Sequence, residues 1–218
     1  MVDLADARRN MVDCQLRTNR ITDPAVIEAF ETVPREEFVD DRHRSVAYAD
    51  EDLPLGNGRY LMEPMVFARL VQALEISEND IVLDIGAGTG YSAAILARLS
   101  ATVVAIESDS SLSDRANKTL TDIAVDNAVV IEAPLAEGYP GQGPYGVICI
   151  EGSVSDIPDN ILDQLAEGGR LAAVVDKGTG PGCAMLFLKK DGLISKRTLF
   201  DANIPGLPEF KNQPGFVF

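Results

Sequence analysis

The sequence predicts an α/β fold: a Rossmann-like, doubly wound, mostly parallel sheet of seven strands, with an antiparallel C-terminal hairpin and a helical N-terminal extension. Three observations predict it. From residue 81 onward, short apolar runs alternate with helical patterns, which is typical of parallel strands covered by helices on both faces. A glycine-rich turn follows the first apolar run, and an Asp-Gly pair separates the last two runs.

The first part of the chain, residues 1–80, is expected to form a helical extension with one long loop. Asp23-Pro24 combines an N-cap acceptor with proline at the first helical position, so a helix begins there. Prolines and glycines punctuate residues 46–64, which predicts a long loop. Pro64 then opens a helix whose apolar residues recur at helical spacing, namely Phe67, Leu70, Val71 and Leu74.

The second part, residues 81–218, is expected to hold the sheet. Apolar runs predict its parallel strands at Ile81–Ile85, Thr102–Ile106, Ala128–Ile131, Gly146–Ile150 and Leu171–Val175. Helices are predicted between them, from the glycine turn through Leu99, over Ser111–Ala124, and around Ile161, Leu162 and Leu165 up to Gly168-Gly169. Asp191-Gly192 predicts the hairpin turn between strands Ala184–Leu188 and Leu193–Phe200.

The net charge limits the partners that this chain can have. Its 218 residues include 19 Lys and Arg against 34 Asp and Glu, which gives a net charge of −15. Binding to nucleic acid or to anionic lipid needs a basic surface, so we expect neither partner. No apolar run is long enough to span a membrane, and the 3 cysteines lack the spacing of a zinc site or a disulfide scaffold. We therefore expect a cytoplasmic protein without a metal, as a monomer or weak dimer.

The glycine-rich turn is the most informative motif. A strand ends in Asp84 and continues into a helix through Gly-x-Gly-x-Gly, which differs from the Gly-x-Gly-x-x-Gly of dinucleotide binders. Glycines permit a tight turn and the close approach of a ligand to the backbone. The predicted cofactor-binding residues in this stretch are Asp84, Ile85, Gly86, Ala87, Gly88, Thr89, Gly90 and Tyr91.

Glu107 supports the same interpretation. It ends the second strand, where a carboxylate can accept the hydroxyls of a ribose, and Ser108 follows it as a further cofactor-binding candidate. A carboxylate at Asp84, before the first glycine, suits a cationic or amino-bearing ligand. Together these features indicate S-adenosylmethionine, whose sulfonium and amino groups are positive. A Rossmann turn for another nucleotide cofactor remains the alternative.

Several further strings resemble the protein-L-isoaspartate O-methyltransferase family over roughly residues 10–176. In chain order they are Met11-Val12-x-x-Gln15-Leu16, Ile21-x-Asp23, Val33-Pro34-Arg35-Glu36-x-Phe38-Val39, Ala47-Tyr48-x-Asp50, Leu53-Pro54-Leu55-Gly56, Pro64, the glycine turn, Ile157-Pro158 and Gln164-Leu165-x-x-Gly168-Gly169-Arg170-Leu171. The resemblance implies a class I methyltransferase fold with S-adenosylmethionine as donor. It also implies that the acceptor is the carboxylate of an isoaspartyl residue in a damaged protein or peptide. Residues 81–218 would then bind the cofactor, and the loop within residues 1–80 would face the substrate.

The chain departs from the family pattern where the acceptor is bound. The family usually has Gln-Thr-Ile-Ser after its glycines, and this chain has Arg59-Tyr60-Leu61-Met62. After the fourth strand of the sheet the family usually has Thr-Ala-Ala, and this chain has Glu151-Gly152-Ser153. The family's adenine-contacting Gly-Asp-Gly is Ala133-Pro134-Leu135 here. The predicted acceptor-site residues are Arg59, Tyr60, Met62 and Glu151.

Three functions follow from these observations. The first is repair methylation of isoaspartyl carboxylates by an altered site, in which Arg59 or Tyr60 compensates for the missing serine hydroxyl. The second is a methyltransferase of the same fold that acts on another acceptor, neutral or cationic, since Glu63 and Glu151 repel an anion if both face the site. The third is a protein that binds S-adenosylmethionine without catalysis.

Overall fold

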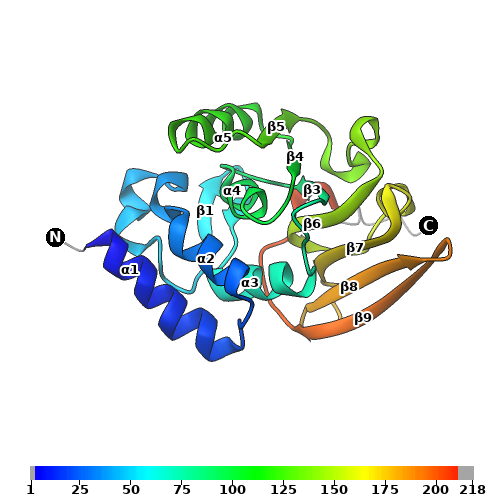
Figure 1. The fold of residues 1–218 in the computed structure, drawn as a ribbon, viewed down its shortest axis with the longest axis horizontal. Coiled ribbons are helices and arrows are strands. Elements are labelled where there is room, and N and C mark those ends of the chain that lie inside the picture. Colours follow the sequence, from blue (N-terminus) through cyan, green and yellow to red (C-terminus); the bar gives the residue numbers. More distant parts are fainter. Residues whose placement is uncertain (1–2, 211–218) are drawn as a thin grey trace, which may run out of the picture.

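The computed structural model describes residues 3–210 and confirms the predicted seven-stranded sheet (Figure 1). The strand order is β5-β4-β3-β6-β7-β8-β9; neighbours from β5 to β7 run parallel, and β8 and β9 run antiparallel. The strands are β3 (Ile81–Ile85), β4 (Thr102–Glu107), β5 (Ala128–Glu132), β6 (Tyr145–Val154), β7 (Leu165–Val175), β8 (Cys183–Lys190) and β9 (Leu193–Asp201).

Helices cover the sheet and build the N-terminal extension. They are α1 (Leu4–Met11), α2 (Pro24–Thr32), α3 (Pro64–Ala73), α4 (Tyr91–Ala97), α5 (Ser110–Asp122) and α6 (Asp159–Leu162). Asp23 caps α2 as expected, because its carboxylate accepts from the amides of Ala25 and Val26. Among the described residues, none of the helices is long and apolar enough to cross a membrane.

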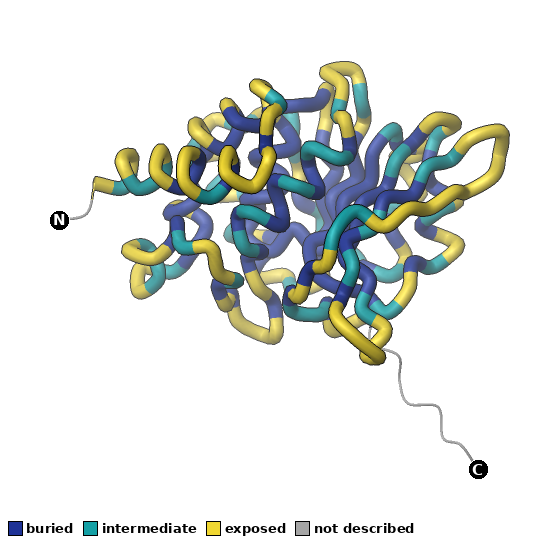
Figure 2. The backbone as a smooth tube through the Cα atoms, turned by 90° about the horizontal axis from the view of Figure 1, so that it is seen from below, coloured by how far each residue is buried: buried dark blue, intermediate teal, exposed yellow. Residues whose placement is uncertain are grey.

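Two hydrophobic cores lie on opposite faces of the sheet, because successive strand residues point in opposite directions. Val82 of β3 belongs to a first core, which α1 to α5 share. The next residue, Leu83, belongs to a second core together with Ile161 of α6 and with Leu207 and Phe210. Figure 2 shows the buried chain inside, with the exposed strand β9 at the margin. The N-terminal extension therefore packs on the first core, and the C-terminal residues pack on the second.

Residues 46–64 are not only loop, which corrects the sequence prediction. They contain an antiparallel hairpin of β1 (Leu53–Gly56) and β2 (Arg59–Leu61). Buried and exposed residues alternate along both strands, and the turn between them has φ of 102°, 50° and 76° at Gly56, Asn57 and Gly58. The strands are so short that their alternation is hidden among prolines and glycines in the sequence. This hairpin aims Arg59 at the sheet.

The sequence prediction is also wrong at Leu165, which it places in a helix that ends at Gly168-Gly169. In the structure α6 ends at Leu162, and Leu165 already pairs with Tyr145 as the first residue of β7. The register of β7 against β6 shifts between Leu165 and Arg170. A Cβ on Gly169 would lie 3.0 Å from the carbonyl oxygen of Tyr145, so this glycine serves an irregular strand rather than a helix end.

The chain after β9 returns to the sheet as a strap, defined here as residues 204–210. The amide of Ser153 donates to the carbonyl of Pro205 at 3.0 Å, and the amide of Leu207 donates to the carbonyl of Ser153 at 2.9 Å. The hydroxyl of Ser155 donates to the carbonyl of Phe210 at 2.7 Å. The strap thus lies along the end of β6, which extends to Val154, past the predicted end at Ile150.

Candidate functional site

The glycine turn lies at the carboxyl end of β3, where ligands bind in open α/β sheets. Gly86, Gly88 and Gly90 have φ of 86°, 55° and 93°, a region that favours glycine. The amides of Gly86 and Ala87 donate to the carbonyl of Ile106 at 2.9 and 3.1 Å. The turn is therefore fastened to β4 and is rigidly placed beside Glu107, the last residue of that strand.

Glu107 is fully buried and has hydrogen-bond partners at both carboxylate oxygens. Its Oε2 accepts from the amide of Gly88 and from Arg59 Nη2, each at 2.8 Å. Its Oε1 accepts from the amides of Ser108 at 2.8 Å and Asp109 at 3.2 Å. A carboxylate offers about four lone-pair positions, so the protein itself satisfies those that we expected a ribose to use.

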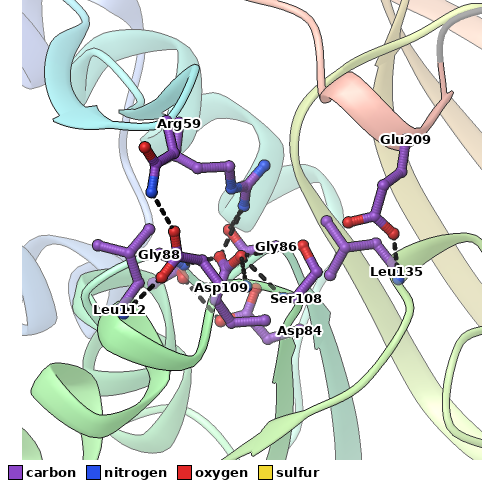
Figure 3. A network of polar contacts seen from close by, with 12 residues as sticks. Arg59, Asp84, Gly86, Gly88, Ser108, Asp109, Leu112, Leu135 and Glu209 are labelled. Atoms are coloured by element: carbon purple, nitrogen blue, oxygen red, sulfur yellow. Dashed lines mark hydrogen bonds and ion pairs between the residues drawn. The ribbon is translucent and has the colours of Figure 1, made fainter.

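Arg59 is the partner that the sequence did not suggest for Glu107. It reaches down from the β1–β2 hairpin to the glycine turn, and its Nη2 also donates to the carbonyl of Gly86 at 2.8 Å (Figure 3). Its side chain is 5% exposed, and its Nε has no partner. Arg59 was predicted to face the acceptor; the structure places its terminal nitrogens on the predicted cofactor residues.

Two further acids, Asp84 in β3 and Glu151 in β6, are buried and form no ion pair among the described residues. Asp84 accepts from the hydroxyl of Ser92 at 2.6 Å through Oδ2, whereas its Oδ1 has no partner. Burial, and then the charge of Glu107, raises the pKa of Asp84 to about 7, although the Ser92 bond opposes the shift. Burial and the charge of Asp84 raise the pKa of Glu151 well above its usual value. At physiological pH, Asp84 is therefore protonated in part of the molecules, and Glu151 favours its protonated, neutral form.

The predicted acceptor residues do come together, around a small cavity. Arg59, Tyr60, Met62 and Glu151 line it with Asp52 and residues of the strap. Met62 and Glu151 are 5% and 8% exposed, whereas Tyr60 is 41% exposed and lies at the mouth. The cavity has a volume of about 10 Å³, which holds one water molecule at most.

The remaining predicted cofactor residues serve the packing of the turn. Ile85 is fully buried in the second core, and Ala87 is 4% exposed in the first. Thr89 donates its hydroxyl to the carbonyl of Phe38 at 2.6 Å. Tyr91 lies edge-on to Phe38, with the Arg35 guanidinium 4.9 Å from its ring centre. Thr89 and Tyr91 therefore anchor the turn to the N-terminal extension.

Sequence reasoning missed the residues that cover the turn. A Cβ on Gly88 would lie 2.8 Å from Leu55 Cδ1, and one on Gly86 would lie 3.3 Å from Leu207 Cδ2. Glu209 accepts from the amide of Leu135 at 2.8 Å, as Figure 3 shows. One feature of the sequence could have indicated that Leu207 covers the turn: it is an apolar residue between Pro205 and Pro208, in a stretch with no strand or helix pattern.

Comparisons with known proteins agree with this architecture. The profile of the family "Protein-L-isoaspartate(D-aspartate) O-methyltransferase (PCMT)" matches residues 7–203. The chain is 39% identical over 175 residues to protein-L-isoaspartate O-methyltransferase 1 of Syntrophobacter fumaroxidans, covering 80% of this chain and 82% of that protein. It is 39% identical over 194 residues to the protein-L-isoaspartate O-methyltransferase of Koribacter versatilis, covering 89% and 86%.

Two solved structures share the fold. One protein-L-isoaspartate O-methyltransferase superposes with a TM-score of 0.81 at 25% identity; the match covers 92% of this chain but only 65% of that one. A putative protein-L-isoaspartate O-methyltransferase of Plasmodium falciparum, solved with S-adenosyl-L-homocysteine, also gives 0.81 at 21% identity, covering 96% of this chain and 100% of that one. Given the profile match and the identities with curated relatives, this chain belongs to the protein-L-isoaspartate(D-aspartate) O-methyltransferase family.

Proposed function

We propose that this protein is an S-adenosylmethionine-dependent methyltransferase that acts on the isoaspartyl carboxylate of a damaged protein or peptide. The observation that carries the proposal is the juxtaposition at one sheet edge of the glycine turn, the buried Glu107 and a cavity lined by Arg59 and Met62. The family membership and the relatives' names support the same reaction.

The chemistry of the residues at the turn fits this cofactor. Gly86 and Gly88 present backbone without side chains, Glu107 is a carboxylate at the end of the second strand, and Asp84 keeps one oxygen without a partner. These groups suit a ribose and a cationic amino acid portion. Bound there, S-adenosylmethionine supplies the methyl group. Holding it requires that Arg59 and Leu207, which now cover Gly86, move aside.

The acceptor carboxylate needs a cation and exclusion of water rather than a base. A carboxyl group of this kind has a pKa of about 4, so it is ionised at neutral pH and no proton has to be removed. Arg59 is the one Arg or Lys among the described residues that line the cavity, and its Nε is an unused donor. Positioning and desolvation of this kind supply up to about 7–11 kcal/mol of rate enhancement.

A second acceptor class has an observation of its own. Asp52 and Glu151 line the cavity. Glu63 follows Met62 in the sequence, and burial and then the charges of Asp52 and Asp50 raise its pKa to about 7. The two acids in the lining favour a neutral or cationic acceptor whenever they are ionised. The alternative function is therefore methylation of such a group by the same fold.

Transfer of a labelled methyl group to an isoaspartyl peptide tests the proposal. The expected product is a base-labile methyl ester, which is absent with the matching aspartyl peptide and is suppressed by S-adenosylhomocysteine. Label that is stable to base, or label on a peptide with an amine in place of the carboxylate, would transfer the assignment to the second acceptor class.

We also propose a cytoplasmic location, because the cysteines at positions 14, 149 and 183 carry no disulfide in the described residues.

A further inference from the structure

The strap of residues 204–210 crosses the residues that are expected to hold the cofactor. At its centre, Leu207 is 3% exposed. A Cβ on Gly86 would lie 3.3 Å from the Leu207 side chain, and a Cβ on Gly152 would lie 2.8 Å from it. Leu207 thus fills the space between the ends of β3 and β6.

The strap also occupies the turn after β5. The carboxylate of Glu209 accepts from the amide of Leu135 at 2.8 Å. This turn, Ala133-Pro134-Leu135, replaces the Gly-Asp-Gly that the family resemblance associates with adenine. The strap therefore contacts the end of β6, the glycine turn after β3 and the turn after β5. In Figure 1 the last turn of the strap is drawn in red, and it packs against the turn after β5.

Little space is left beneath the strap. Two cavities border the glycine turn and the acceptor residues, one against Met62 and Leu207 and the other against Leu55 and Gly86, and each has a volume of about 10 Å³. Pockets for small molecules and cofactors measure about 300–1,000 Å³. A nucleoside-sized ligand therefore enters only if side chains and backbone leave this place.

We propose that the strap is an intramolecular competitor of the cofactor: residues 204–210 close the nucleoside site through Leu207 and Glu209, and the site binds its ligand only when the strap lifts away. This inference rests on the proposed function, since it takes S-adenosylmethionine as the ligand. The strap begins directly after residue 203, where the match to the family profile ends.

The strap is held by the burial of Leu207 and Phe210 in the second core and by a few polar contacts. Its backbone is joined to Ser153 through two hydrogen bonds and to Ser155 through one. Its single charged contact, Glu209, is exposed and bonds a neutral amide. When only a fraction of the molecules has a lifted strap, the apparent affinity for the ligand is reduced by that fraction.

Hydrogen exchange with S-adenosylhomocysteine as the probe gives opposite results for a competitor and for an ordinary wall of the site. A bound ligand normally protects the residues that surround it. A displaced strap instead exchanges faster, so the amides of Leu207 and Ser153 should lose protection when S-adenosylhomocysteine is added, while amides of the glycine turn gain it. Unchanged or stronger protection of residues 204–210 in the ligand-bound protein would overturn the proposal.

Variants of the strap test the same competition by calorimetry. Leu207→Ser should tighten binding of S-adenosylhomocysteine by about tenfold, and Glu209→Ala should tighten it to a smaller degree. The matched controls are Leu193→Ser, on a leucine that is 74% exposed in the hairpin, and Glu78→Ala, on another exposed glutamate; both should leave binding unchanged. Glu209→Ala removes only a surface carboxylate, so it remains informative if Leu207→Ser fails to fold.

The outcomes separate this inference from the proposed function. Binding that is no tighter in either strap variant than in its control contradicts the competitor, even if isoaspartyl peptides are methylated. Tighter binding together with a peptide that stays unlabelled supports the competitor and contradicts the proposed acceptor. Absence of S-adenosylhomocysteine binding in the parent protein and in both strap variants contradicts both.

Discussion

Arg59 Nη2 lies 2.8 Å from Glu107 Oε2, and the two side chains are 5% and 0% exposed. The pair joins β2 in the N-terminal extension to the end of β4 in the sheet, 48 positions away in the sequence. Breaking a buried ion pair by removing one partner is costly because it leaves a charge uncompensated. The two partners differ in what else they bind, so the two halves of the pair should not be equivalent.

Glu107→Gln should destabilise the protein more than Arg59→Gln. In Glu107→Gln, the buried guanidinium of Arg59 loses its counter-charge, and one of the two oxygens that accept from Arg59 and the surrounding amides becomes a donor. The expected loss in free energy of unfolding is about 3–5 kcal/mol. Without Arg59, the carboxylate keeps the amides of Gly88, Ser108 and Asp109. The expected loss is then the smaller value of one hydrogen bond to a charge, about 1.5–3 kcal/mol. Urea unfolding of both variants measures the order, and the reverse order contradicts this description of the pair.

Asp84 should make the protein less stable as the pH rises from about 4 to 7. Burial raises its pKa from 3.8 to about 7, so its contribution to stability is fully present below the unfolded pKa and is lost as the pH rises through the folded one. The folded state holds a proton in this range that the unfolded state has released. The free energy of unfolding therefore falls by up to about 1.4 kcal/mol per pH unit.

Asp84→Asn isolates this effect from the other carboxylates. The difference in unfolding free energy between the parent protein and Asp84→Asn should shift with pH between 4 and 7 and stay level above that range. Asp114→Asn, on an exposed aspartate of α5, serves as the control and should show no such trend. If the unfolding free energies of the parent protein and Asp84→Asn change with pH in parallel, Asp84 is already ionised in the folded protein over this range.

The sequence predicted the sheet well because each strand carries its own signal. Ile81–Ile85 is a continuous apolar run before a glycine turn, and the structure has β3 at those residues. It predicted the site only in part, because the decisive contacts are long-range. Nothing near Arg59 in the sequence points to Glu107, and nothing near Leu207 points to Gly86. Only tertiary packing brings these residues together, because Arg59 lies on a short hairpin and Leu207 lies on an irregular strap.

Met62→Ser combined with Glu151→Thr should raise the catalytic efficiency on isoaspartyl peptides. Both side chains line the acceptor cavity. The double variant provides hydroxyls that can donate to the substrate carboxylate and removes a buried carboxyl group from the lining of the cavity. A hydrogen bond to a charged group is worth about 1.5–3 kcal/mol, so an increase in kcat/KM of roughly tenfold to a hundredfold is expected. Met62→Ala opens the same space without a hydroxyl and should give little gain; no gain in the double variant counts against isoaspartate as the acceptor.

Arg35 should hold the segment from Ala47 to Met62 in place, because it binds the backbone at both ends of that segment. It is fully buried; its Nε donates to the carbonyl of Ala47 at 2.7 Å, and its Nη2 donates to the carbonyl of Met62 at 2.8 Å. Arg35→Met keeps the apolar bulk but leaves two buried carbonyls unpaired, at about 1–3 kcal/mol each. The free energy of unfolding should therefore fall by about 2–6 kcal/mol, and the KM for peptide should rise because the backbone at Met62 is no longer fixed. Arg98→Met, on an exposed arginine at the end of α4, should change neither quantity. If the free energy of unfolding falls no further in Arg35→Met than in Arg98→Met, the segment from Ala47 to Met62 keeps its position without the hydrogen bonds of Arg35.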